Sequence, residues 1–149
     1  MNAVAERWRA LAPWMQGVLR IAAAASFWLH GSAKLFAFPP SPNPRREIEL
    51  FSQIGLAGIL EVVGGGMMLL GIFTRPVAFL LSGEMAVAYF QSHFPRGLYT
   101  TQNGGEAAYL FCFIWLFYSA AGAGRLSIDH LLSAQRSGQR RNSAGRTQP

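Results

Sequence analysis

The sequence predicts an all-α fold, namely an integral membrane bundle of four helices with both termini in the cytoplasm. Its residues are 51% hydrophobic and only 13% charged, whereas ordinary soluble domains are about 25% charged. The apolar residues fall in four long runs between residues 21 and 121, and the last 25 residues are polar and basic. We therefore expect one transmembrane unit over residues 1–132 and a disordered basic tail over residues 133–149.

Each of the four apolar runs is long enough to cross a bilayer. About 20 helical residues rising 1.5 Å each match a hydrocarbon core of roughly 30 Å. A soluble bundle would show charged outer faces at helical spacing, but these runs are apolar on every side. The expected spans are 15–36, 53–73, 76–94 and 105–123.

The connections between the runs carry turn and interface signals. The first loop is extended, because it contains four prolines, and residues 45–51 then suit a short amphipathic stretch at the membrane interface. Residues 74–76 form a turn so tight that the second and third helices must be antiparallel neighbours. Residues 127–132 can form a short capped helix. The first run is too long for a signal-peptide core and should remain part of the protein.

Positive charge is distributed unevenly between the two ends of the predicted bundle. Nine Lys and Arg residues lie on the side of the termini and the second loop, and four lie on the other side. Cytoplasmic loops are enriched in positive charge, so both termini should be cytoplasmic. The basic tail and the net charge of +6 suit anionic lipid headgroups. No base-reading motif accompanies them, so we expect no nucleic-acid partner.

Titratable residues inside the spans are the strongest candidates for a functional site. Charges are costly in hydrocarbon and usually face the interior of the protein. Counting about 1.5 Å per residue from the cytoplasmic boundary places these residues at three depths. The three expected layers are His30 with Glu84, Lys34 with Glu61, and His93 with Glu106.

The middle layer predicts a buried ion pair. His30 and Lys34 are four residues apart and therefore share one helix face, which must look inward. Glu61 lies at the same depth as Lys34, and either charge alone would be expensive to bury. Residues 64–66 are glycines that either allow close helix contact or leave room for a ligand.

Two interpretations of these residues remain open. In the first, they form a polar clasp that only fixes the order of the helices. In the second, His30, Lys34, Glu61 and Glu84 line a cavity that binds the head of a quinone or another small amphiphile and exchanges protons with it. Tyr89, His93 and Glu106 are secondary candidates. The sequence offers no catalytic motif, no metal-ligand spacing and no evident cofactor motif.

Several short motifs, in order along the four spans, resemble the DoxX family of small bacterial membrane proteins. The resemblance covers about residues 19–129. It rests on Arg20, the stretches His30–Leu35, Leu69–Gly71 and Thr74–Arg75, Glu61 with Gly64 and Gly65, Asn103–Glu106, and Gly122-x-Gly124 leading to Asp129. It implies a four-helix bundle in the bacterial inner membrane, and it associates the chain with membrane oxidoreductase complexes, quinone chemistry and oxidative stress.

Two functions of different class follow from these expectations. The chain is either a redox-associated subunit that binds quinone and works with an oxidoreductase partner, or a non-enzymatic component such as a small-molecule carrier or an assembly factor. The sequence does not decide whether it is an enzyme, and it leaves a homo-oligomer open as well.

Overall fold

The computed structural model describes residues 2–40 and 49–145, with side chains up to Gln139. These residues form helices and turns and no strand. The part of the chain described contains α1 (Ala3–Leu35), α2 (Gln53–Leu70), α3 (Thr74–Ala88), the π-helical segment η1 (Tyr89–His93), the short 3₁₀ segment η2 (Phe94–Arg96), α4 (Thr100–Asn103), α5 (Glu106–Ala121) and α6 (Ile128–Gly145). The all-α class is therefore confirmed.

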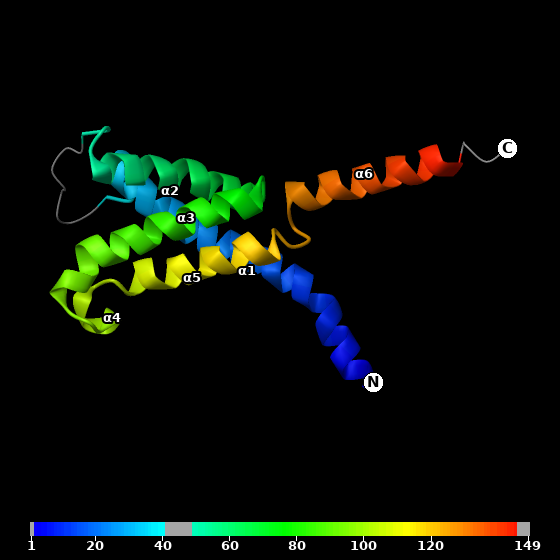
Figure 1. The fold of residues 1–149 in the computed structure, drawn as a ribbon, viewed down its shortest axis with the longest axis horizontal. Coiled ribbons are helices and arrows are strands. Elements are labelled where there is room, and N and C mark those ends of the chain that lie inside the picture. The colour runs from blue at the N-terminus through cyan, green and yellow to red at the C-terminus, as the bar shows by residue number, and fades with distance from the viewer. Residues whose placement is uncertain (1, 41–48, 146–149) are drawn as a thin grey trace.

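The four predicted spans correspond to α1, α2, α3 with η1, and α5. Among the described helices, α2 alone is both long and apolar enough to cross a membrane by length and composition, while α5 is apolar but shorter. The first helix begins well before the predicted span. Its N-terminal part, which contains Pro13, turns away from the bundle (Figure 1), as expected where proline removes a helical hydrogen bond.

The helices pack mainly as two antiparallel pairs, α1 with α2 and α3 with α5. The turn between α2 and α3 joins the pairs at the end of the bundle near both termini. Gly71 ends α2 in the left-handed conformation, and the amides of Gly71 and Ile72 both donate to the carbonyl of Met67. This is a glycine-terminated helix end, and it reverses the chain within a few residues.

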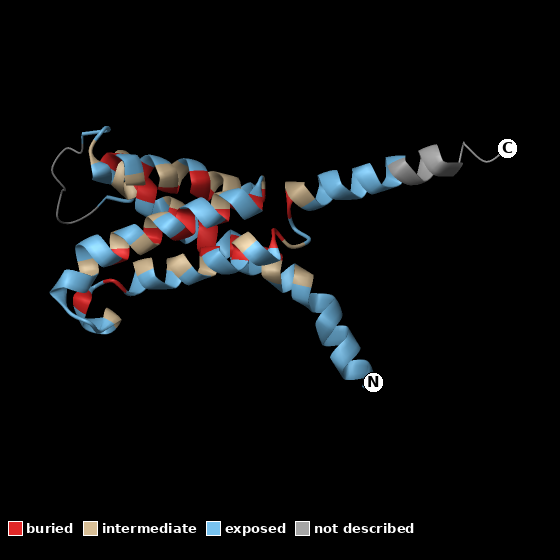
Figure 2. Ribbon diagram, viewed as in Figure 1, coloured by how far each residue is buried: buried red, intermediate tan, exposed pale blue. Residues whose placement is uncertain are grey.

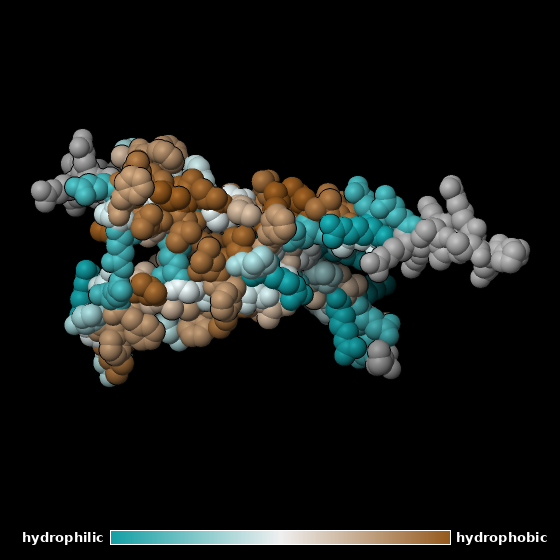
Figure 3. Space-filling view, turned by 45° about the horizontal axis from the view of Figure 1, so that its top comes forward, coloured by the Kyte–Doolittle hydropathy of each residue, from teal (hydrophilic) through white to brown (hydrophobic). Residues whose placement is uncertain are grey.

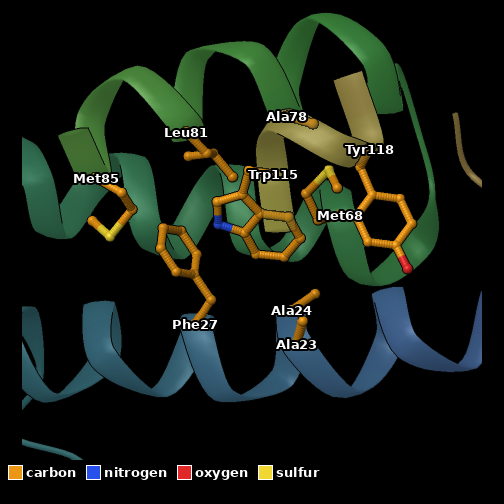
Figure 4. Packing of buried hydrophobic residues seen from close by; sticks show 9 residues of the cluster. All are labelled: Ala23, Ala24, Phe27, Met68, Ala78, Leu81, Met85, Trp115 and Tyr118. Carbon is orange, nitrogen blue, oxygen red and sulfur yellow. The ribbon is translucent and has the colours of Figure 1, made fainter. Parts of the chain in front are cut away.

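Buried apolar residues fill the space between the two pairs in the middle of the bundle. Phe27 of α1 packs edge-on against Trp115 of α5 with ring centroids 5.3 Å apart (Figure 4). Met68 of α2 and Leu81 of α3 are fully buried in the same cluster. The buried residues lie along the inner faces of the helices, whereas the outer faces are exposed (Figure 2).

A buried arginine ties the first pair to the segment that follows α5. Arg20 has no exposed surface, and its guanidinium donates to the carbonyls of Met68 and Leu69 at the end of α2 and of Ala123 and Leu126 beyond α5. Carbonyls at a helix C-terminus lack helical partners and carry partial negative charge. Arg20 therefore holds three segments together with its charge.

The segment after α5 also holds the start of α3. Asp129 accepts hydrogen bonds from the amides of Phe73 at 3.0 Å and Thr74 at 2.9 Å, and a carboxylate suits the positive end of a helix. The amide of Asp129 donates to the carbonyl of Gly71 at 3.0 Å. We call the contacts of Arg20 and Asp129 the basal lock.

The C-terminal tail differs from the sequence prediction. Residues 133–149 were expected to be disordered, whereas α6 continues to Gly145 in the structure. Ser127 caps the helix by accepting from the amide of His130 at 3.1 Å, and the residues that follow include good helix formers and no proline before Pro149. Polar composition alone therefore did not prevent a helix. The predicted interfacial stretch 45–51 lies mostly outside the described residues.

Close contact between α1 and α2 depends on Gly31. A Cβ at Gly31 would lie 2.7 Å from the Cβ of Glu61 and 2.8 Å from the amide nitrogen of Val62. Real Cβ atoms do not approach so closely, so the two helices would have to move apart. Gly66, on the same pair, has nothing within 4 Å of the corresponding position.

We expect Gly31→Ala to lower the free energy of unfolding in detergent by about 1–3 kcal/mol, because the added methyl meets backbone that cannot give way. Gly66→Ala is the matched control, and it should be neutral or slightly stabilising because alanine favours helix. Thermal unfolding of the two variants measures the difference. Equal midpoints would contradict the close contact at Gly31.

Candidate functional site

A cavity of about 920 Å³ lies between the two helix pairs, toward the end of the bundle away from the termini. Figure 3 shows the molecule hollowed at that end. The tight turn and the basal lock join the pairs at the end near the termini, and at the other end a hydrogen bond from Gln53 to Gln91 links α2 with η1. The four principal residues predicted from the sequence, His30, Lys34, Glu61 and Glu84, all line this cavity.

Lys34 and Glu61 form the predicted buried ion pair. The Nζ of Lys34 lies 2.6 Å from the Oε1 of Glu61, and the two side chains are 20% and 3% exposed. Gly31 brings α1 against the Cβ of Glu61, so the lysine one helical turn further along lies directly opposite the carboxylate. The ion pair is confirmed, and it forms part of the cavity wall.

The glycines after Glu61 do not open the cavity. Side chains at Gly64 and Gly65 would meet Leu81 at 2.7 Å and Trp28 at 3.3 Å, and none of the three glycines lines the cavity. Of the two roles expected for them, Gly64 and Gly65 serve close helix packing. The space beside Glu61 comes instead from the separation of the two helix pairs.

His30 of α1 and Glu84 of α3 both line the cavity. His30 is exposed, and its ring lies edge-on to Phe111 of α5 with centroids 5.9 Å apart. Glu84 is half-buried, and both of its carboxylate oxygens are inaccessible to solvent and lack a hydrogen-bond partner among the described residues. No hydrogen bond joins His30 to Glu84 in the described structure, so they share a cavity without direct contact.

The outermost predicted layer does not form an ion pair in the part of the chain described. His93 lines the cavity, and its Nδ1 lies 3.3 Å from the carbonyl oxygen of Asn103. Glu106 is exposed at the first turn of α5 and does not line the cavity. Tyr89 is buried in an aromatic cluster with Phe90, Phe94 and Tyr109, so it too lies outside the lining.

The π-helical segment η1 contributes lining residues that the sequence interpretation did not name. Gln91, Ser92 and His93 all face the cavity. A π-turn is wider than an α-turn and often occurs at functional sites, and no sequence pattern announced it. The side chain of Gln91 accepts a hydrogen bond from Gln53 at the start of α2. In the sequence, the signal for these lining residues was the position of Gln53 and Gln91, two polar residues near the ends of apolar runs.

The remaining wall of the cavity is largely apolar. Beyond the polar groups, its surface comes from side chains such as Phe27, Leu60, Phe79, Met85 and Phe111. A concave site with apolar walls and a few converging polar groups is typical of small-molecule binding. The described residues include no group of three His, Cys, Asp or Glu side chains placed to hold a metal ion.

Comparisons with known proteins agree with the motifs in the sequence. A sequence model of the DoxX family matches residues 16–94, which include the larger part of α1 and all of α2, α3 and η1. A relative from Haemophilus influenzae, described as an uncharacterized protein, is 39% identical over 121 residues, which cover 79% of this chain and 90% of the relative. No solved structure matches the chain.

Breaking the ion pair should destabilise the bundle. Removing one partner of a buried pair leaves the other charge uncompensated and typically costs about 3–5 kcal/mol. We therefore expect Lys34→Ala and Glu61→Ala each to lower the unfolding midpoint in detergent, and the double variant to lose less than the sum. A double-mutant cycle by thermal unfolding measures the coupling. Strictly additive losses would show that the two side chains do not interact.

Proposed function

The chain belongs to the DoxX family, and we propose that it is a multi-pass protein of the bacterial plasma membrane that binds quinone or a similar small amphiphile. The observation that carries this proposal is the cavity of about 920 Å³, with ionisable side chains set in apolar walls. Its volume falls within the range of about 300–1,000 Å³ typical of small-molecule sites. We infer that the protein acts as a redox-associated subunit whose partner carries the electrons.

Exposed apolar side chains support the membrane setting. Large hydrophobic residues on the outer faces of α2 and α5 are more than half exposed, among them Val63, Leu70 and Phe113, and Figure 3 shows such residues gathered over the bundle. Water-soluble monomers rarely expose contiguous apolar patches beyond a few hundred Å². A hydrocarbon environment would remove the cost of exposing them.

The distribution of Lys and Arg supports a cytoplasmic location for both termini. Both terminal segments, α6 and the start of α1, project from the same end of the bundle (Figure 1), and that end has most of the cationic residues of the chain. Reporter fusions at the C-terminus and after Arg96 should therefore report opposite compartments. A periplasmic C-terminus would overturn this orientation.

A non-enzymatic role is the second candidate, and the ion pair favours it. Lys34 and Glu61 neutralise each other and join α1 to α2, as a purely structural clasp would. A carrier or assembly factor needs no redox partner. Ligand flux in proteoliposomes that contain this protein alone would favour that role.

The binding proposal predicts a selective effect at His30. We expect His30→Ala to weaken binding of decylubiquinone, tested in both redox states, by about three- to tenfold, because the imidazole is a polar group that can orient the ligand head. Its unfolding midpoint should not change, since His30 is exposed. Calorimetry on detergent-solubilised protein measures binding.

The matched control is His130→Ala, since His130 is also exposed but lies on α6, outside the cavity. Equal affinities for His30→Ala and His130→Ala would remove His30 from the site. The absence of quinone binding by the unmodified protein would refute the proposed ligand.

A further inference from the structure

A second cavity, of about 580 Å³, lies at the end of the bundle near the termini, where α6 and the start of α1 leave it (Figure 1). It shares no lining residue with the cavity between the helix pairs. Its walls come from α1, the start of α3, the end of α5 with the segment that follows, and the start of α6. The Lys, Arg, Asp and Glu residues in these walls are Arg75, Arg125 and Asp129. We call this cavity the basal cleft.

The positive charge in the basal cleft has no anionic partner in the part of the chain described. The carboxylate of Asp129 is engaged, since it accepts hydrogen bonds from the amides of Phe73 and Thr74. The pair of Lys34 with Glu61 is the one ion pair among the described residues, so no carboxylate there pairs with either arginine of the cleft. The basal cleft thus contains two cations for one carboxylate, and it attracts anions.

Both guanidinium groups have a defined position while most of their donors stay free of protein partners. The guanidinium of Arg75 donates to the carbonyl of Ala120, and its Nε and Nη2 lie 3.5 Å from the position that a Cβ on Gly122 would take. The Cζ of Arg125 lies over the ring of Trp14, 5.6 Å from the ring centroid. A guanidinium has several N–H donors in a fixed planar fork. A ligand that accepts hydrogen bonds can therefore bind both arginines.

We propose that the basal cleft binds a phosphate group, with Arg75 and Arg125 as its charged donors. Guanidinium groups form paired, charge-assisted hydrogen bonds with phosphate oxygens. The contact with Trp14 restricts where the Arg125 guanidinium lies, and this lowers the entropy lost on binding. In the orientation proposed above, the cleft meets the cytoplasmic leaflet, whose anionic lipids present phosphate esters. This site is separate from the quinone site and does not depend on it.

Thermal unfolding of the intact protein in detergent tests the site, because a ligand that binds the folded state raises the midpoint. The ligands are dioleoylphosphatidylglycerol, dioleoylphosphatidylcholine and, at constant ionic strength, inorganic phosphate. We expect phosphatidylglycerol to raise the midpoint saturably and phosphatidylcholine, whose choline neutralises the phosphate, to leave it unchanged. A saturable rise with inorganic phosphate as well would show that the phosphate group suffices, whereas a rise with phosphatidylglycerol alone would identify a lipid headgroup. No saturable rise with either anion, or an equal rise with phosphatidylcholine, would overturn the proposal.

Substitutions separate a built site from general attraction by surface charge. Arg125→Gln and Arg75→Gln should each raise the half-saturating concentration of phosphatidylglycerol about tenfold, because a charge-assisted contact is lost. Arg136→Gln is the matched control, since it removes the same charge from the exposed face of α6 at the same end of the molecule, outside the cleft. Equal effects at Arg125 and Arg136 would overturn the site.

The Arg125 variant decides the question even where Arg75→Gln, which loses the contact with Ala120, fails to fold. The guanidinium of Arg125 makes no hydrogen bond in the described structure, so its substitution should leave the midpoint without ligand nearly unchanged. Quinone binding should also be unchanged in this variant, because the two cavities share no lining residue. Failure of the phosphate site would therefore leave the proposed function intact.

Discussion

Arg20 is fully buried, and its guanidinium donates hydrogen bonds to carbonyls on two separate segments, the end of α2 and the chain beyond α5. A buried charge is tolerated when its donors are satisfied, and here the acceptors are carbonyls in the last turn of α2 and in the non-helical segment after α5. Arg20 thus fixes α1 to the end of α2 and to the segment after α5, at the end of the bundle near the termini. Asp129 binds the start of α3. Together with Arg20 it holds the helices together at that end of the bundle.

The far end of the bundle is arranged differently. There α1 and α2 stay in contact because Gly31 permits close approach, and the pair of α3 and α5 separates from them to enclose the cavity. Lys34, Glu61 and Glu84 line this cavity.

Sequence patterns predicted the all-α class, the approximate bounds of the main helices apart from the start of α1, and the pair of Lys34 with Glu61, because hydrophobic run length and the cost of buried charge act locally or at a shared depth. They did not indicate that α6 continues beyond Leu132. A polar, basic composition is compatible with an exposed helix as well as with a disordered tail. The π-turn at Gln91 escaped prediction, and the sequence left open which of its two expected roles Gly64 has. Both depend on how helices distant in the sequence pack.

The claim that the helix pairs enclose a ligand site is tested most directly by photolabelling with an azido-quinone, followed by mass spectrometry of the peptides. The account predicts adducts on lining residues of α2, α3 and α5, such as Leu60, Gly83 and Phe111, and their loss when unlabelled ligand is in excess. Adducts confined to exposed outer residues such as Phe113, and unaffected by competitor, would contradict it.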